Sequence, residues 1–259
     1  MLEAYRTPDR LQARIAFHDR YAGAGEDFHR WLFSHAEAAA DARVLEVGAG
    51  TSRLWGTNAY RVPPGWRLTL TDVSEGMVEA TLGVVADAGL SASVRLADVQ
   101  SLPFGDGEFD LAFANHMLYH VPDLPRAVAE LRRVLRPGGL LIAATNGAQH
   151  LSGLRELPVE LADDAVTVVG SAGLSFTLEN GGQELRRAFS DVVVLRRDDE
   201  VLADDPDLVL AYLRSMIYLP DEPSPTVAAR LAAWEAGVRT RMAEGPFVVQ
   251  RSSGFFLAR

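Results

Sequence analysis

The stretch VLEVGAGTS, residues 44–52, decides the fold. It is a short apolar run that contains an acid, Glu46, and continues directly into a loop with two glycines, Gly48 and Gly50. An apolar strand followed by a glycine turn and a segment of helix length is typical of a strand–helix–strand unit in a parallel sheet. The glycines permit a tight turn and let a ligand approach the main-chain amides. Two glycines alone are equally explained by a plain turn with no ligand.

The same alternation of strand and helix patterns continues outward from this stretch to residue 146, and two further strands follow later in the chain. The apolar runs expected to form strands are 43–48, 66–72, 93–99, 108–115, 138–146, 191–203 and 247–259. Right-handed crossovers fix how such units wind. We therefore predict an α/β fold: a Rossmann-like, doubly wound, mostly parallel seven-stranded sheet with an antiparallel edge strand, accompanied by a helical substrate lid.

We expect one domain over residues 1–259, because no linker or repeat divides the chain. Its parts are an N-terminal helical cap (1–41), a cofactor-binding core (42–146), and a second half of the sheet (147–259) with lid insertions near 147–175 and 203–245.

Composition limits the classes of function. The 259 residues include no cysteine, which excludes thiolate catalysis, cysteine-bound zinc and disulfides. A net charge of −10 disfavours nucleic acid as a partner. Residues 1–20 lack the apolar core of a secretory signal, and no run approaches the roughly 18 apolar residues of a membrane span. We expect a cytoplasmic protein without a membrane partner, and a homodimer is an open option.

The spacing around the glycines excludes two phosphate ligands. A dinucleotide loop needs glycine at its first, third and sixth positions, and the sixth position counted from Gly48 is Arg53. A triphosphate loop needs lysine followed by serine or threonine, and this loop has no lysine. The loop therefore favours a ligand without a pyrophosphate contact.

Three acids recur at the ends of predicted strands: Glu46, Asp72 and Asp98. Ligands of open parallel sheets bind beyond the carboxyl ends of the strands, so these acids should share one crevice. Such a crevice suits a ligand with hydroxyls, amines and a positive charge. Asp72 lies about 20 residues after the glycines, where an acid can accept both ribose hydroxyls. Asp98 is placed to accept an adenine amine, with Val99 beside it. Taken singly, each acid is better explained as a loop carboxylate or a helix cap.

The run from VLEVGAGTSRLW through WRLTLTDVSEGMVEA and VRLADV to LRPGGLLIAATN resembles the class I S-adenosylmethionine-dependent methyltransferases, in particular the type 11 or ubiquinone-menaquinone-methylase-like group. The resemblance covers residues 43–146 and departs from the family at Ser52, where a third glycine is usual. It implies S-adenosyl-L-methionine as the cofactor and a small molecule as the methyl acceptor. The cofactor-binding residues implied are Tyr21, Glu46, Gly48, Ala49, Gly50, Asp72, Val73, Met77, Asp98, Val99 and Asn115.

Methyl transfer mainly requires a nucleophile held in line and water excluded. A general base would help an oxygen acceptor, and His116 and His120, directly after the fourth strand, are candidates. A structural role for both is the favoured alternative. His150 is a second candidate, whereas His18, His29 and His35 are expected in packing or at the surface. We expect no metal site, because no histidine pair has carboxylates at ligand spacing.

The lid segments are rich in leucine, valine and small residues, which favours a small, largely apolar acceptor. Packing of these residues on each other is the alternative. Alanine, arginine and leucine are abundant, as in proteins of GC-rich bacteria, which by association favours a role in bacterial specialised metabolism. We expect O-methylation. N- or C-methylation, a tRNA or protein substrate, and a related fold that acts as a cyclase or binding partner remain alternatives.

Overall fold

The computed structural model describes residues 9–22, 25–168 and 175–259. Its centre is a seven-stranded sheet of order β3-β2-β1-β4-β5-β9-β7. The strands are β1 (Arg43–Val47), β2 (Arg67–Asp72), β3 (Ala92–Leu96), β4 (Phe109–Asn115), β5 (Leu135–Asn146), β7 (Val192–Ala203) and β9 (Phe247–Ala258). The first five are mutually parallel, and β9 runs antiparallel to both of its neighbours, β5 and β7. The predicted fold class is confirmed, with the antiparallel strand one place in from the sheet edge.

Helices cover both faces of the sheet because β1 and β4 are apolar on both faces. One face carries α5 (Leu124–Val134) and α7 (Gly181–Leu185), and the other carries α2 (Phe28–Phe33), α3 (Arg53–Asn58) and α4 (Glu75–Asp87). In α5 the Asp123 side chain accepts the Arg126 main-chain N–H and caps the helix. The buried positions of α5 then recur at helical spacing: Leu124, Ala127, Val128, Leu131 and Val134.

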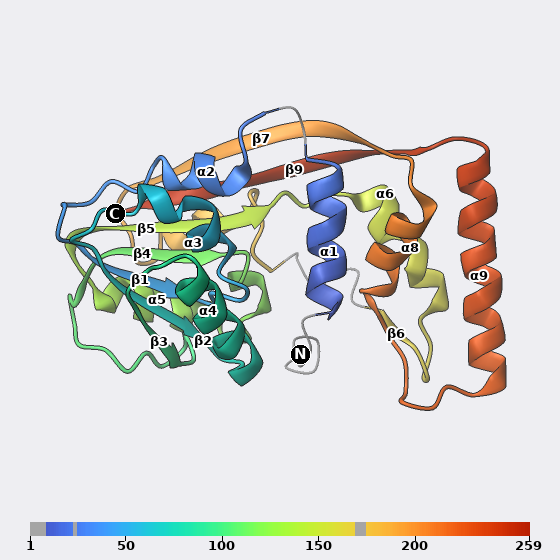
Figure 1. Ribbon diagram of the computed structural model, residues 1–259, viewed down its shortest axis with the longest axis horizontal. Helices are drawn as coiled ribbons and strands as arrows, with labels where there is room; N and C mark the ends of the chain where they lie inside the picture. Colours follow the sequence, from blue (N-terminus) through green and yellow to red (C-terminus); the bar gives the residue numbers. More distant parts are fainter. Residues whose placement is uncertain (1–8, 23–24, 169–174) are drawn as a thin grey trace.

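A second lobe lies beside the sheet and has its own apolar core (Figure 1). It consists of α1 (Asp9–Arg20), α6 (Ser152–Arg155), α8 (Pro206–Arg214), α9 (Pro225–Ala243), and a small antiparallel pair, β6 (Thr167–Val168) with β8 (Ile217–Tyr218). We call these elements together the lid lobe. Short 3-10 turns occur elsewhere in the chain at Ala59–Arg61 and Leu118–His120, and after α6 at Leu157–Leu161.

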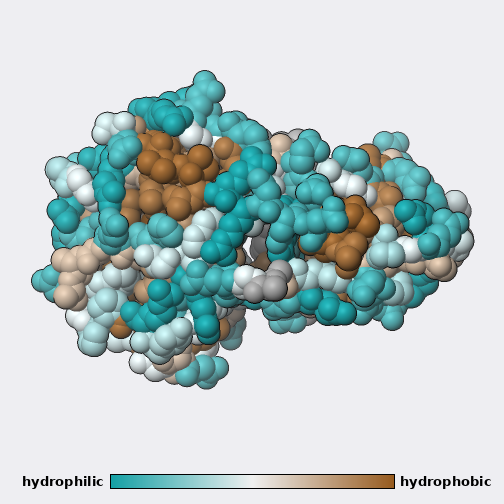
Figure 2. Space-filling model, turned by 90° about the horizontal axis from the view of Figure 1, so that it is seen from above, coloured by the Kyte–Doolittle hydropathy of each residue, from teal (hydrophilic) through white to brown (hydrophobic). Residues whose placement is uncertain are grey.

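The two long strands β7 and β9 join the lobes. Phe255 and Phe256 of β9 lie in the cores on the two sides of the sheet, whereas Val249 of β9 and Val201 of β7 lie in the core of the lid lobe. Figure 2 shows a broader and a narrower mass with a waist between them. In the part of the chain that is described, no helix is both long and apolar enough to span a bilayer.

Candidate active site

A cavity of about 710 Å³ lies between the carboxyl ends of the parallel strands and the lid lobe. Its sheet side is formed by the glycine loop and by residues that follow β2, β3 and β4. Its lid side is formed by α1, by His150 after β5, and by residues of β7 and β9. Of the residues predicted to bind the cofactor, the following line it: Glu46, Gly48, Ala49, Gly50, Asp72, Val73, Met77, Asp98, Val99 and Asn115.

Glu46 is a buried carboxyl group at the floor of this cavity, 2% exposed. Trp55 Nε1 donates to its Oε2 at 2.5 Å, and Asn115 Nδ2 donates to its Oε1 at 2.8 Å. Burial raises the pKa of Glu46 to about 7, although both hydrogen bonds oppose the shift. The two hydrogen bonds thus fix the orientation of the carboxyl group.

In the glycine loop, every second residue from 48 to 52 lies in the left-handed region of backbone conformation. The φ angles are 63° at Gly48, 56° at Gly50 and 51° at Ser52. Ser52 therefore takes the conformation that a glycine adopts more readily. Its Oγ donates to Thr81 Oγ1 at 3.0 Å, and Thr81 Oγ1 donates to the Gly50 carbonyl at 3.0 Å. The serine side chain is fully buried against α4 and is not part of the cavity wall, so it fastens the loop to that helix.

Asp72, at the end of β2, uses both carboxylate oxygens to organise the adjacent turns. Oδ2 accepts the Gly50 N–H at 2.9 Å, and Oδ1 accepts the Ser74 N–H at 3.0 Å. The register of β1 with β2 places Asp72 next to the glycine loop. Met77 on α4 is buried beside it, while Val73 is half exposed at the cavity edge.

Asp98 follows β3 and lies at the same end of the sheet. Its Oδ1 accepts the Gln100 N–H at 2.8 Å, and the Gln100 side-chain amide donates to both carboxylate oxygens at 3.0 Å. Val99 is buried next to it. The three acids predicted to share a crevice do border one cavity.

Five of the six histidines of the chain line this cavity: His18, His29, His116, His120 and His150. Burial is the main cause that lowers their pKa values: to about 4 for His18, His29 and His120, to about 3 for His116, and well below the usual value for His150. All five are therefore neutral at neutral pH. His18 and His29 were expected in packing or at the surface. They reach the cavity because α1 and the start of α2 contribute residues to its wall.

Tyr21, the remaining residue of the predicted cofactor set, is not among the residues that line the cavity. Its hydroxyl accepts the main-chain N–H groups of Asp204 and Asp205, at 3.1 and 2.9 Å, and donates to Asp204 Oδ1 at 3.2 Å. Its ring packs on Phe17, 4.9 Å between centroids. Tyr21 thus fastens the end of α1 to the start of α8.

Two arginines that the sequence did not single out hold the N-terminal segment over the cavity. Arg251 on β9 donates to the Tyr21 carbonyl at 2.7 Å and pairs with Asp199 on β7. Arg197 on β7 donates to the Glu26 carbonyl at 2.8 Å. Its guanidinium carbon also lies 3.8 Å from the centroid of the Trp31 ring, on which the group stacks. The alternation along β7 and β9 puts these side chains on one face, but only the register between the strands pairs them.

The described lid segments do not supply the apolar acceptor wall that their composition favoured. Within 147–168 and 203–245, His150 alone contributes to the cavity. The leucines and valines of these segments are instead buried against each other in the core of the lid lobe. Residues 169–174, which belong to the predicted segment 147–175, lie outside the described residues.

Comparison with known proteins agrees with this geometry. Residues 45–143 match a family described as a methyltransferase domain. A ubiquinone/menaquinone biosynthesis C-methyltransferase of Bordetella avium is 31% identical over 121 residues, which is 47% of each chain. A malonyl acyl-carrier-protein O-methyltransferase of Erwinia pyrifoliae is 31% identical over 170 residues, 62% of each chain. The chain thus spans about half the length of the curated relatives it matches.

Solved structures share the fold over most of the chain. The cyclase SpnF has a TM-score of 0.61 at 18% identity, covering 100% of this chain and 96% of that one. The YcgJ protein of a Bacillus species has a TM-score of 0.61 at 15% identity, covering 89% and 96%. The fold is therefore that of the class I methyltransferases, and residues 45–143 within it match the methyltransferase domain family.

Proposed function

We propose that this protein transfers a methyl group from S-adenosyl-L-methionine to a small molecule. The observation that carries the proposal is one continuous cavity with two different ends. Glu46, Asp72 and Asp98 border the sheet end, whereas the neutral rings of His18 and His150 border the lid end beside the ion pair of Arg251 with Asp199. A cationic cofactor with hydroxyls and amines fits the first, and an uncharged acceptor fits the second.

The residues at the sheet end fit this cofactor. Asn115 Oδ1 is buried and has no hydrogen-bond partner within the described residues, although Asn115 Nδ2 is bound to Glu46. Such an atom calls for a donor from a ligand, and the cofactor's amino group is one. Asp72 would accept the ribose hydroxyls, and Asp98 with Val99 would hold the adenine. The bound cofactor supplies an activated methyl group on a sulfonium.

The protein's part is to orient the acceptor and to exclude water, which can supply roughly 7–11 kcal/mol of barrier reduction at its upper range. The N-terminal segment, clamped by Arg197 and Arg251, covers the cavity. We propose a small and mainly apolar acceptor that is methylated on oxygen, of the kind found in bacterial specialised metabolism. A polymer such as RNA fits poorly with a cavity covered in this way and a net charge of −10.

His116 and His120 remain the candidates for a general base. Both are neutral at neutral pH, which is the form that takes up a proton. Their lowered pKa values make them weak bases, because proton transfer is best served by a pKa near the working pH. If either acts, its replacement by alanine slows oxygen transfer about 100-fold or more. Near-normal turnover in both variants would leave positioning as the source of the rate.

The test is calorimetric titration with S-adenosylmethionine, with its demethylated product S-adenosylhomocysteine, and with NAD. We expect the first two to bind and NAD not to bind. Methyl transfer to a panel of phenols, followed by mass spectrometry, then tests the activity. Binding of NAD, or of none of the three, would contradict the proposal.

The second candidate is a non-methylating role on the same fold, as a cyclase or a binding partner. The weakness of the candidate bases is the observation that favours it. This role predicts that S-adenosylmethionine binds as well as it would to a methyl-transferring protein, and that no acceptor gains a methyl group. N- or C-methylation would instead appear as product mass on amines or activated carbons of the panel.

A further inference from the structure

His150 lies in the cavity wall. One nitrogen of its ring is held by β9, and the other has no hydrogen-bond partner among the described residues. Its Nδ1 lies 2.9 Å from the Ser252 carbonyl oxygen and 3.2 Å from the Ser252 main-chain nitrogen on β9. Its Nε2 is buried and makes no hydrogen bond to any described residue. The residue is 4% exposed. A buried polar atom without a partner costs about 1–3 kcal/mol, so a retained one calls for a partner from outside the chain.

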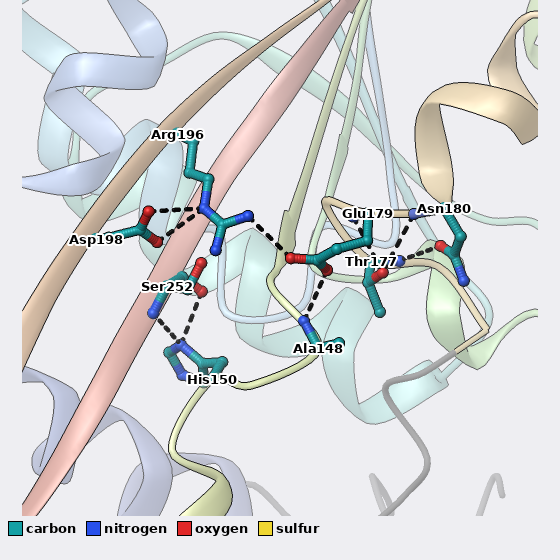
Figure 3. A network of polar contacts seen from close by, with 8 residues as sticks. All are labelled: Ala148, His150, Thr177, Glu179, Asn180, Arg196, Asp198 and Ser252. Atoms are coloured by element: carbon teal, nitrogen blue, oxygen red, sulfur yellow. Dashed lines mark hydrogen bonds and ion pairs between the residues drawn. The ribbon is translucent and has the colours of Figure 1, made fainter.

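The loop that carries His150 is held in place by a polar network (Figure 3). Glu179 Oε2 accepts the Ala148 N–H at 2.8 Å, and Glu179 Oε1 accepts from Arg196 at 2.9 Å. The Leu151 N–H donates to the Gln250 carbonyl at 2.8 Å and ties the other side of the loop to β9. The loop is thus held by β9 and by Glu179, and the imidazole itself is held by Ser252 on β9, which fixes where Nε2 lies.

The lid lobe supplies a second ring next to it. His18 on α1 lies 5.6 Å from His150 between ring centroids, with 36° between the planes. Both residues line the same cavity. Another buried ring nitrogen, His29 Nδ1, has Asp27 Oδ1 at 3.8 Å, so its need for a partner is partly met.

We propose that His150 binds the acceptor, with Nε2 hydrogen-bonded to a hydroxyl oxygen of an uncharged, ring-bearing molecule that lies against the His18 ring. A hydroxyl group meets either tautomer of the imidazole, because it both donates and accepts. Burial lowers the pKa of His150 well below its usual value, so the ring offers no charge to an ionised ligand. That the bound molecule is the methyl acceptor rests on the proposed function, but the contact with His150 can be measured without turnover.

Two probes of nearly the same shape isolate this contact: 2-naphthol and naphthalene, which differ by one hydroxyl. Their binding is followed by probe fluorescence, with and without S-adenosylhomocysteine. We expect the wild-type protein to bind 2-naphthol about tenfold more tightly than naphthalene, the equivalent of one hydrogen bond. His150→Phe should reduce this ratio to about one, and His150→Gln should retain part of it.

His35→Phe is the matched control, because His35 lies outside the cavity wall; it should keep the wild-type ratio. In wild-type protein with ¹⁵N-labelled histidine, the Nε2 signal assigned to His150 should move when 2-naphthol is added. This second measurement does not depend on the folding of a variant.

Equal binding of the two probes by the wild-type protein, no binding of 2-naphthol, or an unmoved His150 signal would overturn the inference. A ratio that persists in a folded His150→Phe variant would do the same. Affinity for S-adenosylhomocysteine is measured in parallel and should not change in His150→Phe. Its absence in the wild-type protein would count against the proposed function and leave the probe ratio standing.

Discussion

The parallel sheet and the lid lobe differ in how their residues come together. In the sheet, the three cavity acids belong to consecutive strand–helix units, and each sits at a strand end that its own local sequence defines. The lid lobe collects its core from the N-terminal helix, the segment after β5, and the residues around β7, α8, α9 and β9. The residues that the sheet contributes to the cavity can therefore be identified from the local sequence. The residues of the lid lobe come together only through contacts between distant parts of the chain.

The two regions also differ in charge. The sheet end of the cavity carries carboxyl groups, whereas the seam between sheet and lid carries histidines kept neutral by burial beside ion pairs such as Arg53 with Asp19 and Arg251 with Asp199. Protonation of these histidines destabilises the folded state as the pH falls, whereas protonation of Glu46, whose pKa burial raises, acts in the opposite sense. The predictions that follow test this contrast.

The largest expected effect is loss of the folded state in acid. The histidines at the seam have native pKa values near 3 to 4, against about 6.5 when unfolded. The unfolded chain then binds more protons, so stability is present above pH 6.5 and is lost as the pH falls toward 4. Each such histidine contributes up to about 1.4 kcal/mol per pH unit.

Urea unfolding followed between pH 7 and 4.5 measures this slope. His18→Gln should lower the slope by about one proton, and His35→Gln, outside the cavity, should leave it unchanged. A wild-type stability that does not vary over this range would contradict neutral histidines at the seam.

Alanine substitutions at Gly48 and Gly50 distinguish the cost of a steric clash from the cost of a strained backbone conformation in the glycine loop. A Cβ at Gly48 would meet Met117 Cβ at 2.8 Å and Cγ at 2.9 Å, whereas one at Gly50 meets no described atom within 4 Å. Both sites have positive φ. We expect Gly48→Ala to lower the free energy of unfolding by about 3 kcal/mol and Gly50→Ala by about 1 kcal/mol. Thermal and urea unfolding decide this, and equal losses would mean that Met117 yields without cost.

Asp72→Ala should weaken binding of S-adenosylhomocysteine by roughly 10- to 100-fold, about 1–3 kcal/mol. The substitution removes the proposed ribose contact and leaves the Gly50 and Ser74 N–H groups without their carboxylate. Calorimetry on this variant is compared with Asp87→Ala, an exposed acid at the end of α4. Unchanged affinity in Asp72→Ala would sink the ribose assignment.

The smallest effect is expected at Tyr21, the residue that the structure moves from the cofactor to the lid. Tyr21→Phe removes the hydroxyl that accepts two N–H groups before α8. We expect a loss of about 1 kcal/mol in unfolding free energy and no change in affinity for S-adenosylhomocysteine. A clear loss of affinity at unchanged stability would return Tyr21 to the cofactor site.

The sequence was sufficient for the sheet because strand and helix patterns are local, and because parallel strands place their carboxyl ends at one edge. Glu46, Asp72 and Asp98 could be grouped for that reason before any coordinates were known. The apolar composition of 147–175 and 203–245 was a weaker guide. Leucine and valine stabilise a lid core and an acceptor pocket equally well, and composition does not distinguish the two.

By itself, the sequence determined the Rossmann-like sheet, the glycine loop and the edge of the sheet at which the cavity lies. The tertiary structure alone decided that β9 enters between β5 and β7, that Tyr21 faces α8, and that His18, His29 and His150 meet the cavity. The physical reason is sequence separation. His18 and Ser252, which contact His150 from two sides, are more than 200 residues apart in the chain, and only folding of both lobes brings them to one imidazole ring.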